Sequence, residues 1–203
     1  AELVRWRRQE FVRDLANSQR ESLRSVLYET RQAGPVQTTR ALRDVIGLDE
    51  RRRNAVDNYR RLLEANDTEA LRRTLRDRRF DSSVARAAES GEALGPDKID
   101  RMVAQYRNKQ LQSRAETIAR TEAHRVVGLA RREALEQSLE QSGISRDSVW
   151  RVWNTMRDEL VRDEHDDMEG QRVRIDEEFD GDASMDDVNC RCWETYEFDE
   201  EQG

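Results

Sequence analysis

Apolar positions follow a helical period over the first two thirds of the chain. Residues 2–32 contain no glycine or proline, and their apolar residues recur at spacings of seven and four, which predicts one long helix with a single narrow stripe. Gly34-Pro35 ends that helix. A stripe this narrow needs a neighbouring surface, so we expect residues 1–47 to form an extended helical arm.

Helical patterns continue from residue 37 to about residue 142. Val56, Tyr59 and Leu63 lie on one helical face, and the pair Gly95-Pro96 precedes the longest pattern, which Gly143 closes. We predict helices over residues 37–46, from Asp49 to about Ala65, from Asp67 toward Arg79, from Ser82 or Ser83 to Gly91, and over residues 97–141.

The pattern changes to alternation after Gly143. Three segments alternate apolar and polar residues and are rich in strand-forming types: residues 149–153, 171–175 and 190–198. One helical turn is expected between residues 158 and 168. The predicted fold is mainly α with a small C-terminal α+β module. Its parts are an arm (1–47), a helical region (48–142) and the module (143–203). In an alternative division, residues 48–198 form one packed body.

Composition narrows the possible classes of protein. The chain is 39% charged and 35% hydrophobic, and no apolar run is long enough to span a membrane. Residues 141–203 hold only 7 of the 36 basic residues but 20 of the 43 acidic ones, so the larger part is basic and the tail acidic. A basic surface can contact nucleic acid or an acidic protein. Interleaved acidic residues favour a solvated helical surface instead.

The two cysteines, Cys190 and Cys192, form a C-x-C motif. A disulfide between them would close a small strained ring, so we expect free thiols and a reducing compartment. With His165 they offer three ligands that Zn²⁺ prefers, and a fourth would come from Asp158, Asp163, Asp166 or water. In the alternative interpretation, both cysteines pack as small hydrophobic residues and His165 hydrogen-bonds within its turn.

The residues around this cluster favour a structural metal, or no metal, over a catalytic one. The sequence has no H-E-x-x-H motif and no evident general base beside the cluster. It also lacks a phosphate-binding glycine-rich loop and a Ser-His-Asp arrangement. The many carboxylates near His165 are typical of a solvated face.

Glu122 occupies the middle of an expected apolar stripe on the longest helix. Ile118, Val126 and Leu129 are its neighbours on that face, where an unpaired carboxylate is costly. We expect either an arginine partner, Arg162 or Arg191, or a side chain that reaches water. His124 lies about 200° around the helix from Glu122 and should face solvent, which excludes it as a metal ligand.

Two segments together carry a family resemblance. The first is the helical segment containing I-A-R-T-E, and the second is D-x-x-x-R-x-x-H-x-x-x-x-G followed by N-C-R-C at the tail. Across residues 47–196 the chain resembles the phage Mu F-like minor head proteins, also called phage head morphogenesis proteins. Besides Asp158, His165 and the cysteines, the resemblance assigns motif positions to Arg120, Thr121, Glu122, Arg162, Gly170 and Arg191.

The resemblance implies a virion protein of a tailed double-stranded DNA bacteriophage, made in the host cytoplasm. It would act in head assembly near the portal, in few copies, and in genome packaging or delivery. Its partners would be the portal, major capsid or scaffold protein. The alternative is a metal-dependent hydrolase or nuclease that uses His165, Cys190 and Cys192.

The resemblance also bears on the metal ligands. In many relatives the segment at Arg162 and His165 reads C-x-x-C and completes a four-thiolate site with C-x-C. Here at most three of those four ligands remain. In a second interpretation, Arg162 replaces the charge of the metal and pairs with a carboxylate such as Glu122.

Overall fold

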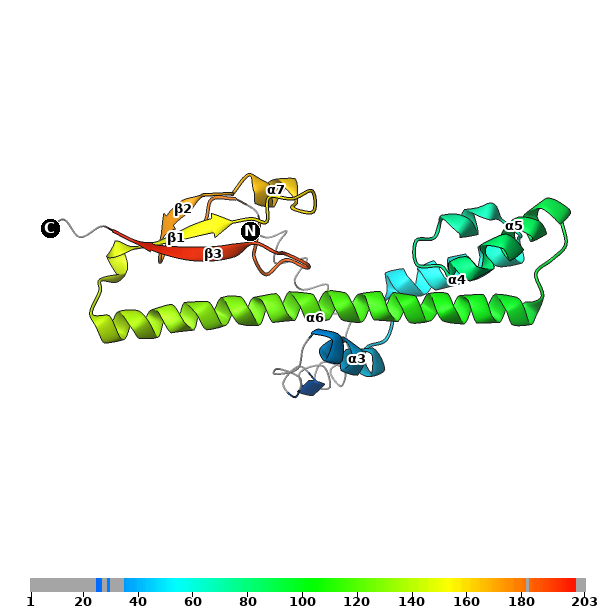
Figure 1. Cartoon of the computed structure of the whole chain (residues 1–203), viewed down its shortest axis with the longest axis horizontal. Coiled ribbons are helices and arrows are strands. Elements are labelled where there is room, and N and C mark those ends of the chain that lie inside the picture. The colour runs from blue at the N-terminus through cyan, green and yellow to red at the C-terminus, as the bar shows by residue number, and fades with distance from the viewer. Residues whose placement is uncertain (1–24, 27–28, 30–34, 182, 200–203) are drawn as a thin grey trace. The chain divides into compact units, whose positions relative to one another are not determined.

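A computed structural model describes residues 25–26, 29, 35–181 and 183–199 (Figure 1). The predicted arm helix over residues 2–32 falls almost entirely outside the described residues. The chain divides into two compact units, one ending at Glu116 and the other containing residues from Thr117 onward. The mainly helical fold with a small C-terminal sheet is confirmed. None of the described helices is long and apolar enough to cross a membrane.

The first unit is helical. It contains α3 (Pro35–Val45), α4 (Glu50–Glu64), α5 (Asp81–Ser90) and the first part of α6 (Pro96–Ser142), all close to their predicted bounds. Asp49 caps α4 by accepting a hydrogen bond from the Arg52 N–H, and Gly91 ends α5 with a φ of 71°. Its core contains the predicted face of α4, packed against α5 and α6 (Val56, Tyr59, Leu63, Val84, Met102, Tyr106).

The continuous helix predicted from Asp67 toward Arg79 is wrong. The segment forms two short 3₁₀ helices, Thr68–Arg72 and Arg78–Phe80. Each begins at an aspartate, Asp67 or Asp77, whose side chain accepts a backbone N–H two residues further on. Such local bonds compete with the α-helical ladder, so the chain turns twice instead of continuing as one helix.

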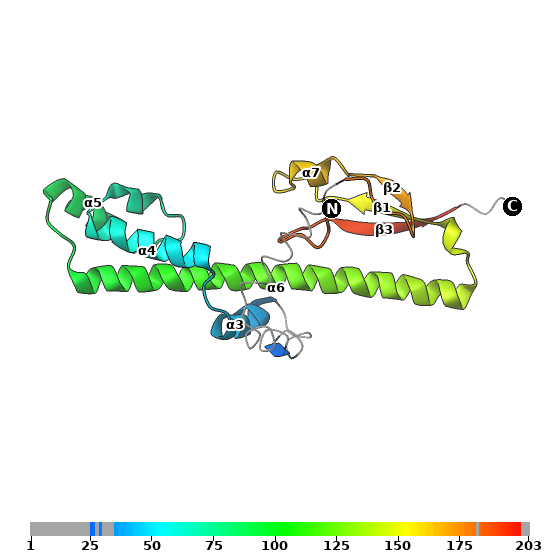
Figure 2. The ribbon, with the colours of Figure 1, turned by 180° about the vertical axis from the view of Figure 1, so that it is seen from behind.

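The second unit pairs the C-terminal part of α6 with a three-stranded antiparallel sheet. The strand order is β2 (Arg172–Arg174), β1 (Val149–Asn154), β3 (Trp193–Phe198). Figure 2 shows the sheet beside this part of the helix from the opposite side to Figure 1. A cluster of Leu135 and Leu139 of α6 with Val149 of β1 forms the contact. The predicted strands and the helical turn, α7 (Asp163–Asp166), are therefore confirmed.

The face of α6 that packs on this module differs from the predicted apolar stripe. Ile118 is buried, but Val126 and Leu129 are 60% and 63% exposed. Further along α6, the buried residues are instead Thr121, Leu135 and Leu139. The sheet covers only part of the helix, and the loop before β3 covers a more polar face. The hydrophobic pattern alone therefore predicts the wrong helical face for the contact with the module.

Gly128 lies within α6, in the part that borders a pocket of the second unit. A Cβ added there meets no atom within 4 Å. We therefore expect Gly128→Ala to stabilise the protein by about 0.8–1 kcal/mol through helix propensity alone. Urea unfolding followed by circular dichroism measures this change. Gly143→Ala is the matched control and should destabilise, because Gly143 ends the helix with a φ of 70°.

Candidate metal centre

The predicted convergence of an imidazole and two thiols is present in the second unit. His165 lies in α7, and the C-x-C segment lies just before β3. The ligand atoms of His165, Cys190 and Cys192 all lie within 4.8 Å of one another. All three residues are buried, with exposed fractions of 2%, 7% and 3%. Both cysteines are free thiols, as expected.

The spacing of these atoms matches a tetrahedral zinc site. The Nδ1 atom of His165 lies 3.6 Å from the Cys190 sulfur and 3.5 Å from the Cys192 sulfur. Zn–S bonds of about 2.3 Å and Zn–N bonds of about 2.0–2.1 Å at a tetrahedral angle place such S and N atoms about 3.6 Å apart. Both S···N distances therefore fit a zinc site. A bound ion would tie α7 to the C-x-C segment.

The other ring nitrogen of His165 is held by two charged groups. Its Nε2 lies 3.2 Å from an Asp187 carboxylate oxygen and 2.8 Å from Arg162. If Nε2–H donates to Asp187, Nδ1 keeps its lone pair toward the sulfurs, which is the tautomer that a metal ligand needs. If Arg162 donates to Nε2 instead, Nδ1 carries the proton toward a thiolate. Asp187 was not identified from the sequence.

Arg162 does not pair with Glu122. Its guanidinium lies 3.6 Å from Asp187 and also bonds the carbonyl of Val188. The ion pair found for Glu122 is with Arg125, one helical turn away, at 3.9 Å. The prediction that Arg162 or Arg191 pairs with Glu122 is therefore wrong. The side chain of Glu122 is 28% exposed, so Arg125 on the same helix can reach it.

The structure does not bring Asp158 into the cluster. Its carboxylate pairs with Arg191 at 2.7 Å, and this ion pair lowers the pKa of Asp158. Arg191 is the second of the two arginines predicted to pair with Glu122. Asp163 and Asp166 are exposed on α7. The fourth ligand therefore does not come from these three carboxylates in this arrangement.

Thr121 links the long helix to the cysteine segment. Its hydroxyl donates to the Thr117 carbonyl at 2.9 Å and accepts the backbone N–H of Asn189 at 3.0 Å. Asn189 has a φ of 59°, a conformation that asparagine tolerates better than most residues. The contact with Asn189 holds the helical motif against the N-C-R-C segment. Gly170, with a φ of 74°, turns the chain after α7, and Arg120 is exposed.

The pKa values of the two thiols shift in opposite directions. The hydrogen bond from Cys192 lowers the pKa of Cys190, and burial opposes this shift. The interaction with His124 lowers the pKa of Cys190 further. Cys190 and burial together raise the pKa of Cys192. Trp153 is buried in the same cluster as both cysteines.

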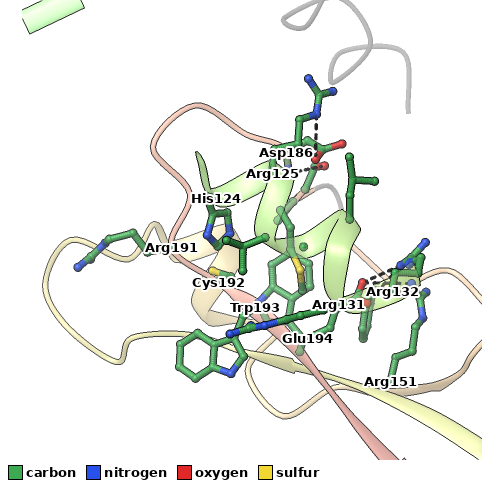
Figure 3. A pocket seen from close by; sticks show the side chains of 18 of the residues that line it. His124, Arg125, Arg131, Arg132, Arg151, Asp186, Arg191, Cys192, Trp193 and Glu194 are labelled. Carbon is green, nitrogen blue, oxygen red and sulfur yellow. Dashed lines mark hydrogen bonds and ion pairs between the residues drawn. The ribbon is translucent and has the colours of Figure 1, made fainter. Parts of the chain in front are cut away.

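The prediction that His124 faces solvent is wrong. Its imidazole is partly buried and interacts with the Cys190 side chain and the Cys192 backbone; the Cys190 interaction raises the pKa of His124, against the effect of burial. Figure 3 shows His124 projecting from α6 toward the segment that carries Cys192. The prediction places His124 by its angle around the helix from Glu122, on the assumption that Glu122 faces the interior. Thr121, three residues before His124, marks the face that the module covers.

The fold and cluster define a helical protein with a small α+β module organised around a His/Cys/Cys group. A family model described as Phage Mu protein F like protein matches residues 78–195, more than half of the chain. The chain belongs to this family, which confirms the resemblance. It is a structural phage family that acts in head morphogenesis, and its members are virion proteins. The comparisons with curated proteins and with solved structures found no match.

Proposed function

We propose that this protein is a minor head protein that acts near the portal vertex, assembles with portal, major capsid or scaffold protein, and has no catalytic role. The observation that carries the proposal is the family match over residues 78–195. Host cytoplasm would be the place of synthesis, and the assembled head the final location. A role in genome packaging or delivery would follow from a position at the portal.

An exposed apolar surface on α6 supports a protein partner. Val126 and Leu129, three residues apart, lie on one face of the helix and are 60% and 63% exposed, and the adjacent Val127 is 48% exposed. Clustered exposed apolar side chains on a soluble domain are typical of protein–protein contacts. This surface is a candidate contact for another head protein.

Direct contact with packaged DNA has weaker support. Several arginines of the described residues are in ion pairs with carboxylates, including Arg60 with Asp100, Arg76 with Asp81 and Arg132 with Glu194. Paired arginines present less net positive charge to a phosphate backbone. Any affinity for DNA should be weak and should fall steeply with salt.

We also propose that His165, Cys190 and Cys192 bind Zn²⁺ as a structural ion. The observed S···N distances, the carboxylate on the far ring nitrogen of His165 and the burial of all three ligands support this proposal. A hydrolase or nuclease would need a metal position open to substrate. The buried ligand set favours a structural role over that alternative.

Particle fractionation tests the head function. Purified heads, tailless particles and free protein from infected cells would be separated on a density gradient and probed for this chain. We expect the chain in heads, in fewer copies than the major capsid protein. Replacing Val126 and Leu129 together by serine should lower its incorporation, whereas Leu160→Ser, at a 78% exposed position in the α7 region, should not. Heads that lack the wild-type chain would refute the proposal.

A further inference from the structure

We propose that His124 is the fourth zinc ligand, so that His124, His165, Cys190 and Cys192 form a closed two-histidine, two-thiolate site. This inference rests on the zinc site proposed above and deepens it. It assigns a ligand to the long helix, which neither the family motif nor the spacing of the sequence indicates. The zinc ion would then join α6 directly to the C-terminal module.

The helix register places His124 at the cluster. Thr121 accepts the backbone N–H of Asn189, the residue next to Cys190, and is buried. His124 follows Thr121 by three residues, which puts it on the same helical face, about one turn further along. The C-x-C segment passes this part of the helix, and the His124 imidazole interacts with the Cys190 side chain.

The remaining side of the site is the side from which His124 approaches. His124 and Cys192 both line the pocket of the second unit, whereas His165 and Cys190 do not (Figure 3). A catalytic zinc would keep its open position there, facing the pocket. An imidazole in that position closes the coordination shell. The ligand atoms of His165, Cys190 and Cys192 lie within 4.8 Å of one another without His124, so the His124 imidazole would have to move toward the sulfurs when the metal binds.

Nearby carboxylates are engaged elsewhere. Asp158 pairs with Arg191, and Asp187 holds the far nitrogen of His165. Asp186 pairs with Arg125 at 3.5 Å. Two thiolates with two imidazoles are also a common structural zinc set, in which all four ligands come from the protein. The ligand chemistry and the position of the side chain therefore both favour His124 as the fourth ligand.

The test compares four full-length proteins: wild type, His124→Ala, His124→Cys and Arg131→Ala. Arg131 lines the same pocket and is the matched control. Each protein is stripped of metal under reducing conditions and titrated with Zn²⁺ against a chromophoric chelator. Parallel titrations with Co²⁺ record the visible absorption bands, which are intense only for tetrahedral sites.

We expect His124→Ala to lower zinc affinity by more than about 100-fold, since even outer partners of metal ligands contribute 10–100-fold. Its cobalt bands should weaken. His124→Cys should restore both affinity and tetrahedral bands, because a thiolate replaces the lost imidazole. Arg131→Ala should behave as wild type. The metal-free proteins should share one melting curve, which separates ligand loss from misfolding.

The opposite results overturn the inference in distinguishable ways. Unchanged zinc affinity and cobalt bands in His124→Ala would show a three-ligand site with an open position, leaving the zinc proposal intact. Failure of His124→Cys to restore the bands would also refute a ligand role. A wild-type protein that binds no zinc would refute both metal proposals, while the head function is judged separately by fractionation.

Discussion

Cys190→Ser is expected to abolish zinc binding and to remove all zinc-dependent stabilisation of the second unit. Serine preserves the size of the side chain but is a poor zinc ligand at neutral pH, since its hydroxyl does not ionise there. At a free zinc concentration 100 times the dissociation constant, the wild-type protein should gain about 2.7 kcal/mol. For a chain of this length that corresponds to a rise of roughly 5–10 °C in melting temperature.

Two measurements check this prediction. Elemental analysis after gel filtration should give one zinc per wild-type chain and none for Cys190→Ser. Thermal melts with added zinc and with chelator should differ for the wild type and coincide for the variant. Met168→Leu is the control, because Met168 is buried in the same cluster but offers no thiolate. If Met168→Leu also lost zinc, packing rather than ligation would explain the result.

Leu63→Ala is expected to destabilise the first unit strongly. Leu63 is fully buried in the core that α4, α5 and α6 share. Removing three carbon atoms from such a site costs about 2–5 kcal/mol, because the lost burial and the resulting cavity add. The unfolding free energy from urea titration should fall by that amount, and zinc binding should persist because all its ligands lie in the other unit.

Leu129→Ala is the matched control for Leu63→Ala. Leu129 is also a helical leucine, but it is 63% exposed. We expect its stability to change by no more than about 0.5 kcal/mol. A large loss at Leu129 would mean that this exposed surface is covered in the isolated protein. A small loss at Leu63 would contradict the described core.

Much of the local structure was predictable because its causes are local. Asp49 and Gly91 are capping residues that begin or end helices wherever they occur in such patterns. Alternation in residues 149–153 similarly predicted β1. The segment between Asp67 and Arg79 was not predictable in this way. Its composition suits a helix, and the aspartate hydrogen bonds that interrupt it depend on the observed backbone geometry.

The candidate site was also predictable only in part from the sequence. By itself, the sequence established the ligand types, because only two cysteines and two histidines are present, and it indicated that His165 and C-x-C meet. It also indicated the family, through motifs whose residues hold the helix to the cysteine segment. Only the tertiary structure showed that His124 projects toward the cysteine segment and that Asp158 pairs with Arg191 instead of joining the cluster. The reason is that a helix presents side chains in every direction, and the segment that covers it determines which direction is the interior.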